Sequence, residues 1–134
     1  MTTLSGSLDA NVLLRLLLND LPNQHQAVVS LFQNASGQFV VSDTAIIETV
    51  FVLDRNYNFS RSAIVETMEG LMSLTEINCN QRLFTKALPI FVKNVGLSFE
   101  DCCMTVYAEL NDAKPLWTFD KKLAKQVPNT KLVV

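Results

Sequence analysis

Short apolar segments alternate with longer helical patterns along almost the whole chain, and this alternation restricts the fold more than any other feature. The apolar segments predict strands over residues 3–8, 38–42, 76–79, 115–119 and 131–134. Helical spacing of apolar residues, or a capping residue that opens the run, predicts helices between them. These helices are expected at residues 11–19, 22–34, 43–55, 60–72, 80–96, 98–111 and 121–126. Strands that alternate with helices form an α/β fold with a mainly parallel sheet.

Length and composition indicate that the chain forms a single domain and that this domain belongs to an oligomer or a complex. The chain has 134 residues, of which 49% are hydrophobic, and this is ample apolar material for one core. No repeat or linker divides the sequence, so residues 1–134 are expected to form one domain. Only 18% of the residues are charged, below the roughly 25% of ordinary soluble domains. A surface poor in charge often hides a patch on a partner, so we expect an oligomer or a complex.

Charge and cysteine content narrow the class of protein further. The formal net charge is −2, so a nucleic acid would have to be met by local positive charge or by a metal ion. The three cysteines include the adjacent Cys102 and Cys103, which does not fit a disulfide framework, so a reducing cytoplasm is expected. Arg15 interrupts the first apolar run, and no basic region precedes it. We therefore expect neither a signal peptide nor a membrane span.

Acidic residues stand where a parallel sheet places its ligands, at the carboxyl ends of strands. Asp9 and Asp120 each follow a predicted strand, and Glu48 and Asp101 lie near the starts of helices. Each also has a structural interpretation. Asp9 and Asp120 could cap the helices that follow them, and Asp101 could belong to a capping box with Ser98. Glu48 lies among aliphatic residues on a helix expected to be buried, where an unpaired carboxylate is costly.

Taken together, these acids predict a metal site. Four carboxylates in one cleft would not all stay ionised at neutral pH without a cation. Carboxylate oxygens and water suit Mg²⁺ or Mn²⁺, whereas zinc prefers histidine and cysteine. The single histidine, His25, lies in a polar stretch and is expected at the surface. The cysteines show no spacing typical of zinc ligands.

Four segments resemble the sequence blocks of PIN-domain ribonucleases, in the family's order and at the expected intervals. They are SLDANVL at residues 7–13, VSDTAIIETV at 41–50, GLSFEDC at 96–102 and LWTFDKKL at 116–123. The compact length and the segment around Tyr57 and Phe59 look most like the VapC-type toxins of toxin–antitoxin pairs.

The resemblance implies a three-layer α/β/α sandwich and an endoribonuclease that depends on Mg²⁺ or Mn²⁺. It assigns the metal-holding role to an acidic quartet, Asp9, Glu48, Asp101 and Asp120. Asn11 and Thr118 would orient those carboxylates. Cations near the acids are candidate RNA contacts, namely Arg15, Lys121, Lys122 and Lys125, and exposure to solvent without a ligand is the alternative for all four. An RNA substrate, an antitoxin protein and a second copy of the chain are the implied partners.

Other functions keep part of this pattern. An aspartyl-phosphate protein would also place an aspartate after the first strand, but it would need a further acid beside Asp9, where this chain has Asn11. A PIN-like module that binds RNA or a partner without cutting is disfavoured because the acidic quartet is complete. A PIN-like nuclease of RNA maturation or of DNA processing is the closest alternative to a toxin.

Overall fold

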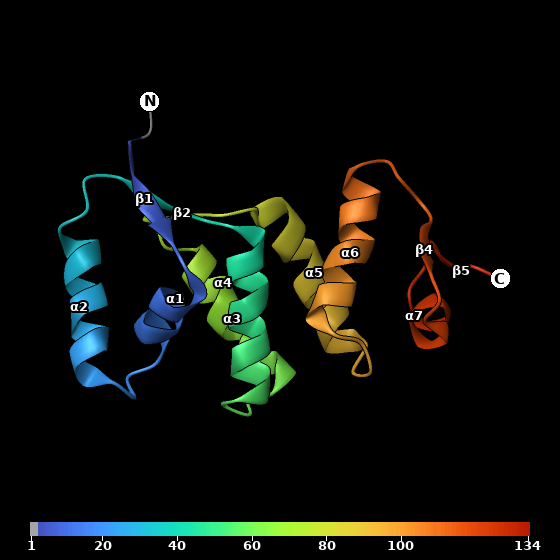
Figure 1. Cartoon of the computed structure of the whole chain (residues 1–134), viewed down its shortest axis with the longest axis horizontal. Helices are drawn as coiled ribbons and strands as arrows, with labels where there is room; N and C mark the ends of the chain where they lie inside the picture. Colours follow the sequence, from blue (N-terminus) through green and yellow to red (C-terminus); the bar gives the residue numbers. More distant parts are fainter. Residues whose placement is uncertain (1–2) are drawn as a thin grey trace. The chain divides into compact units, whose positions relative to one another are not determined.

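The computed structural model describes residues 3–134 and divides the chain into two compact units (Figure 1). The N-terminal unit ends at Asn80, and the C-terminal unit extends from Gln81 to Val134. Over the described residues, no helix has the length and apolar character that a membrane crossing requires.

Strands and helices alternate in the N-terminal unit as the sequence predicts. Its elements are β1 (Leu4–Leu8), α1 (Ala10–Leu17), α2 (Pro22–Gln33), β2 (Gln38–Val41), α3 (Asp43–Arg55), α4 (Arg61–Met72) and β3 (Ile77–Asn78). The strands form one sheet in the order β1-β2-β3, and both pairings are parallel. The register shifts between Leu4 and Gly6, and Gly6 has a φ of 127°, a conformation that glycine adopts without strain.

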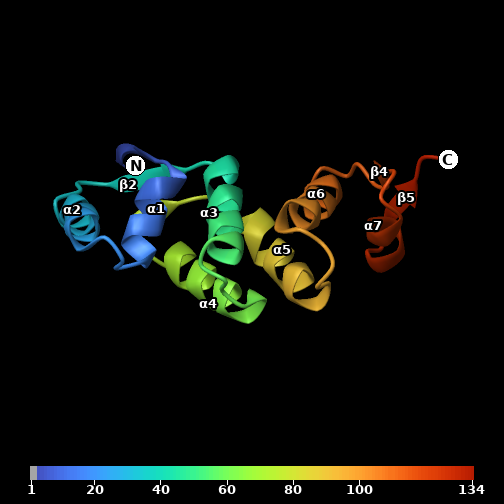
Figure 2. The same ribbon diagram turned by 60° about the horizontal axis from the view of Figure 1, so that its bottom comes forward.

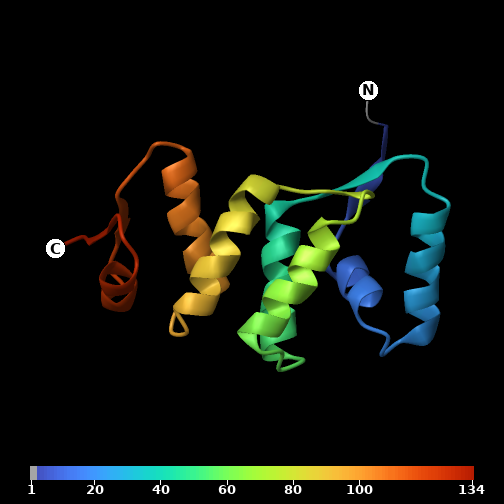
Figure 3. The same cartoon turned by 180° about the vertical axis from the view of Figure 1, so that it is seen from behind.

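The core of this unit lies between the sheet and its helices. Phe39 and Val41 of β2 are buried, whereas Val40 between them is exposed, so β2 buries one face. Leu13 of α1 and Leu53 of α3 are completely buried. Helix α1 lies between α2 and α3 and contacts both (Figure 2). Helices α3 and α4 lie side by side (Figure 3).

The C-terminal unit consists of a helical hairpin followed by a small β-α-β segment. Its elements are α5 (Gln81–Lys93), α6 (Phe99–Leu110), β4 (Leu116–Thr118), α7 (Lys121–Gln126) and β5 (Thr130–Leu132). The Phe99 ring lies against those of Phe84 and Phe91, with centroids 6.0 and 5.4 Å away. Strands β4 and β5 pair in parallel. The buried Thr130 hydroxyl donates to the Val127 carbonyl over 2.6 Å and ties β5 to the end of α7.

The predicted α/β class is confirmed, because every strand pairing among the described residues is parallel. The structure corrects several element ends. The strand expected at 76–79 contains only Ile77 and Asn78. The helix expected to reach Gly96 ends at Lys93. Just past this end, the Asn94 side chain donates to the Ile90 carbonyl over 2.9 Å, and the Leu97 N–H donates to the Asn94 carbonyl in the turn that follows.

Candidate active site

The ends of β1 and β2 bring two helix starts to one edge of the sheet. Leu8 is the register partner of Val41, so the residues that follow them, Asp9 and Ser42, leave the sheet at the same edge. Each is the N-cap of the next helix: Asp9 opens α1 and Ser42 opens α3. The strand ends therefore position an acidic and a hydroxyl side chain together, as expected for a parallel sheet.

Asp9 has the capping role that the sequence left open. Its Oδ1 accepts a hydrogen bond from the Val12 backbone N–H over 3.0 Å, and its side chain is exposed. This bond satisfies one free N–H of the first helical turn. It also fixes the direction of the carboxylate, which leaves further lone pairs for another ligand.

Glu48 is placed differently from the sequence-based expectation. The carboxylate was expected in a buried environment, but its residue is exposed, whereas the neighbouring Ile46, Thr49 and Val50 are buried. Helical spacing explains the difference, because residues 46, 49 and 50 share one face of α3 and residue 48 lies on another. Glu48 therefore carries no cost of burial.

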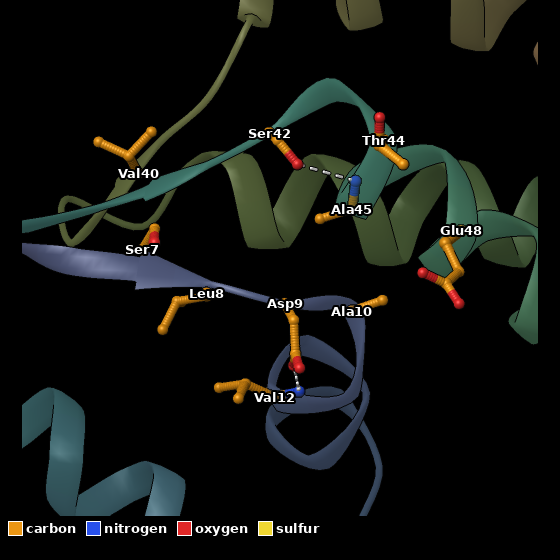
Figure 4. Close-up of a pocket in the computed structure, with 10 residues that line it drawn as sticks. All are labelled: Ser7, Leu8, Asp9, Ala10, Val12, Val40, Ser42, Thr44, Ala45 and Glu48. Carbon is orange, nitrogen blue, oxygen red and sulfur yellow. Dashed lines mark hydrogen bonds between the residues drawn. The ribbon is translucent and has the colours of Figure 1, made fainter.

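Asp9 and Glu48 line the same pocket, which has a volume of about 560 Å³. The lining residues are Ser7, Leu8, Asp9, Ala10, Val12, Val40, Ser42, Thr44, Ala45 and Glu48. Figure 4 shows Asp9 at the start of α1 turned towards Val12, and Glu48 projecting from α3. Neither carboxylate forms an ion pair within residues 3–134, and no basic side chain lines the pocket among them. Two carboxylates that line one pocket without a positively charged partner favour the binding of a cation there.

Three hydroxyl side chains of this pocket were not identified from the sequence: Ser7, Ser42 and Thr44. Ser42 accepts a hydrogen bond from the Ala45 N–H over 3.2 Å and so caps α3. Ser7 lies two residues before Asp9 on β1, and Thr44 lies four residues before Glu48 on α3. Ser7 thus precedes Asp9 by one strand period, and Thr44 precedes Glu48 by about one helical turn. These two spacings are the signal in the sequence that could have identified Ser7 and Thr44.

The other two predicted acids belong to the C-terminal unit. Asp101 lies in the first turn of α6, and its N–H donates to the Ser98 hydroxyl over 3.1 Å. Asp120 is the N-cap of α7, where its Oδ1 accepts from the N–H groups of Lys122 and Leu123 over 2.9 and 3.1 Å. The capping interpretation of Asp120 is therefore correct. For Asp101 only half of the capping box forms, because Ser98 caps α6 but the Asp101 carboxylate accepts no hydrogen bond from the Ser98 N–H within residues 3–134. Both carboxylates keep lone pairs for a ligand.

The two predicted supporting residues differ in their contacts. The Thr118 hydroxyl accepts a hydrogen bond from the Asp120 backbone N–H over 2.9 Å and so holds the start of α7. Asn11 is exposed on α1, and its side chain makes no hydrogen bond within the part of the chain that the structure describes. No group of three or more His, Cys, Asp or Glu side chains suited to a metal ion occurs among residues 3–134.

Of the predicted RNA contacts, Arg15 already has partners. Its guanidinium donates to Asp20 over 3.1 Å and to the Tyr57 hydroxyl over 3.2 Å. The Tyr57 hydroxyl in turn donates to Asp20 over 2.7 Å. This bond from Tyr57, assisted by the charge of Arg15, holds the pKa of Asp20 below its usual range. Lys121 and Lys122 are exposed on α7.

Comparison with known proteins agrees with this arrangement. The PIN domain family matches residues 7–127, a segment that includes all four predicted acids. No curated protein matches the chain significantly. The family match confirms the predicted α/β fold class and is consistent with its three-layer arrangement. PIN domains are in general nucleases that use divalent metal ions and act on nucleic acids. The chain therefore belongs to the PIN domain family.

Proposed function

We propose that the protein is an endoribonuclease that depends on Mg²⁺ or Mn²⁺ and hydrolyses RNA phosphodiester bonds. One observation supports it above the others. In a chain that matches the PIN domain, Asp9 and Glu48 line one pocket beside the carboxyl ends of two parallel strands. We further propose that Asp101 and Asp120 complete the metal site, and that residues 1–134 act as one domain.

The donor atoms in the pocket suit the proposed metal. Mg²⁺ usually keeps several waters and is bound by one or two carboxylates together with substrate phosphates. Asp9 and Glu48 supply two such carboxylates and neither has an ion-pair partner in residues 3–134. When bound, a divalent ion lowers the pKa of a water molecule and neutralises the charge that develops on the phosphate.

The residues of this chain would contribute orientation. The hydrogen bond from the Val12 N–H holds the Asp9 carboxylate in one direction. Asp120 is held twice, through its side chain by the first turn of α7 and through its backbone by the Thr118 hydroxyl. Preorganised carboxylates avoid a reorganisation cost during the reaction. No histidine is required as a general base in this scheme.

A toxin role, with an antitoxin and a second copy of the chain as partners in the cytoplasm, is also part of the proposal. The resemblance to VapC-type toxins supports it. Large apolar side chains at the surface are consistent with protein partners: Phe51 is 57% and Tyr107 is 59% exposed. Induced expression is expected to arrest growth of a bacterial host, and the Asp9→Asn variant to leave growth unaffected. Growth arrest by that variant as well would contradict a nuclease toxin.

The primary test is cleavage of a pool of structured RNAs by the purified protein in Mg²⁺, in Mn²⁺ or in EDTA. We expect cleavage only with metal, and its loss in Asp9→Asn and in Glu48→Gln. Glu66→Gln is the matched control, because Glu66 is an exposed acid of the same unit outside the pocket. Cleavage of DNA in place of RNA would favour the DNA-processing alternative. Equal cleavage by all variants would place the site elsewhere.

A further inference from the structure

Charge is distributed very unevenly between the two units. Residues 1–80 contain three Lys or Arg and eight Asp or Glu, a net charge of −5. Residues 81–134 contain eight Lys or Arg and five Asp or Glu, a net charge of +3. The modest net charge of −2 for the whole chain therefore conceals a basic C-terminal unit. A basic unit is the electrostatic signature of a surface that meets a polyanion.

Helix α5 carries the most ordered part of this positive charge. Arg82, Lys86 and Lys93 are exposed, and α5 contains no acidic residue. At about 100° per residue they fall within roughly 40° of one another around the helix, so they form a single line. The exposed Pro89 lies on the same line, while Phe84 and Phe91 are buried on the other side.

A fourth cation lies beside the turn that follows α5. The Lys122 side chain packs across Gly96 in the turn between α5 and α6, so closely that a Cβ at Gly96 would lie 2.9 Å from the Lys122 Cδ. We call Arg82, Lys86, Lys93 and Lys122 the α5 stripe. Gly96 lies five residues before Asp101, and Lys122 lies two residues after Asp120. The stripe therefore ends close in the chain to Asp101 and Asp120, the two acids of this unit that the proposed metal site includes.

We infer that the α5 stripe binds the phosphate backbone of an RNA strand and leads it towards the acids of the C-terminal unit. Arg82, Lys86 and Lys93 form no ion pair within residues 3–134, so their charges are available to a ligand. Along the helix, Arg82 and Lys86 are about 6 Å apart and Lys86 and Lys93 about 10 Å. A row of cations at such intervals suits a linear polyanion, and each contact releases a counterion.

The chemistry of the stripe favours RNA over a lipid surface. A helix that lies on a membrane inserts large apolar residues such as Trp, Phe or Leu beside its basic face. The exposed positions of α5 hold only Gln81, Arg82, Thr85, Lys86, Pro89 and Lys93. The inference rests on the proposed function, since it adds a binding surface for the RNA that the acids would cut.

Binding of fluorescein-labelled, mixed-sequence RNA, measured by anisotropy in EDTA, tests the stripe independently of cleavage. We expect the double variant Lys86→Gln/Lys93→Gln to bind about ten-fold more weakly at 0.1 M salt. The slope of the logarithm of its RNA affinity against the logarithm of the salt concentration should become shallower by about 1.4. This is about 0.7 for each of the two lost phosphate contacts. The control is Lys114→Gln/Lys131→Gln, which removes the same charge from exposed, unpaired lysines of the same unit.

The outcomes separate the stripe from the nuclease activity. RNA binding that weakens in the stripe variant but not in the control variant supports the inference. This holds even if the wild-type protein cuts no RNA, because only the proposed function then fails. Equal weakening in both variants means that overall charge determines binding, and it overturns the inference. Displacement of the RNA by poly-glutamate at equal charge also overturns it, because the stripe would then bind acidic proteins equally well.

Discussion

Asp9 serves the fold and the proposed chemistry through different properties, which substitutions can separate. Capping requires an acceptor for the Val12 N–H, and asparagine supplies it as well as aspartate does. Asp9→Asn should therefore stop cleavage while the free energy of unfolding stays within about 0.5 kcal/mol of wild type. Asp9→Ala should also stop cleavage and lose about 1 kcal/mol. Urea unfolding and RNA cleavage measure the two effects, and an active Asp9→Asn variant would remove Asp9 from the site.

Asp20 provides a pH-dependent prediction in the same unit. Its pKa is lowered chiefly by the hydrogen bond from Tyr57. A lowered pKa in the folded state stabilises the protein above the unfolded-state pKa, and this stabilisation is lost as the pH falls through the folded-state pKa. Tyr57→Phe should therefore destabilise the protein at neutral pH. Its difference from wild type should shrink as the pH falls below about 4, the usual aspartate value.

Urea unfolding at neutral and at acidic pH checks this prediction. Tyr107→Phe is the control, because Tyr107 is an exposed tyrosine whose hydroxyl has no hydrogen bond within residues 3–134. It should leave the unfolding free energy unchanged at both pH values. A constant difference between Tyr57→Phe and wild type across the pH range would mean that the Tyr57 contribution is packing, with no linkage to Asp20.

The positions of three of the acids at the starts of helices could be predicted from the sequence, because local signals mark those starts. Asp9 and Asp120 follow apolar strands, and Asp101 stands three residues after a capping serine. The partners of Arg15 could not be identified, because Tyr57 lies 42 residues away along the chain. The exposure of Glu48 was missed since its neighbours in sequence are buried on another face of α3. Side-chain contacts that depend on packing have no local signal.

At the scale of elements, the pairing of β1 with β2 depends on a glycine that admits no side chain. A Cβ at Gly37 would lie 2.0 Å from the backbone oxygen of Thr3, the atom that accepts a hydrogen bond from the Gln38 N–H. Gly37→Ala must therefore move one strand, and we expect a loss of about 1–3 kcal/mol of unfolding free energy. Because β1 and β2 position Asp9 and α3, cleavage should fall as well.

Gly70→Ala is the matched control for this substitution. Gly70 lies inside α4, and a Cβ there would meet nothing within 4 Å. Alanine favours a helix over glycine by about 1 kcal/mol, so this variant should be more stable than wild type. Urea unfolding of both variants gives opposite signs if the contact at Gly37 is the cause. Destabilisation of the same size in both would show that loss of any glycine is harmful.

The bounds of helices and strands were predictable where residues within the element determine them. The continuous apolar run of β2 and the serine caps of α4 and α6 predicted those elements within a residue or two. The bounds of α3 were also predicted, but its expected cap, Asp43 or Thr44, is replaced by Ser42. The end of α5 was predicted less well. The helix was expected to continue to Gly96, but it ends at Lys93 and a turn closed by the Leu97 N–H and the Asn94 carbonyl follows. Strand β3 is short because only Ile77 and Asn78 find register partners on β2.

At the scale of the whole molecule, the net charge concealed an uneven distribution of charge between the two units. From the net charge of −2, we expected any nucleic acid to be met by local positive charge or by a metal ion. Counting the charges for each unit separately gives the opposite sign for residues 81–134. An acidic unit with the Asp9–Glu48 pocket and a basic unit with the α5 stripe divide the proposed tasks, since one attracts a cation and the other a polyanion.

Mn²⁺ titration can test the proposal that Asp9, Glu48, Asp101 and Asp120 bind one metal ion together. We expect Asp9→Asn and Asp120→Asn each to weaken Mn²⁺ binding by at least about ten-fold, with Glu66→Gln unchanged. The double variant Asp9→Asn/Asp120→Asn should bind Mn²⁺ little worse than either single variant, because one substitution already removes the shared site. Wild-type protein should gain about 2.7 kcal/mol of stability at 100 times the Kd. Additive losses in the double variant would contradict the proposal, because Asp9 and Asp120 would then act at independent sites.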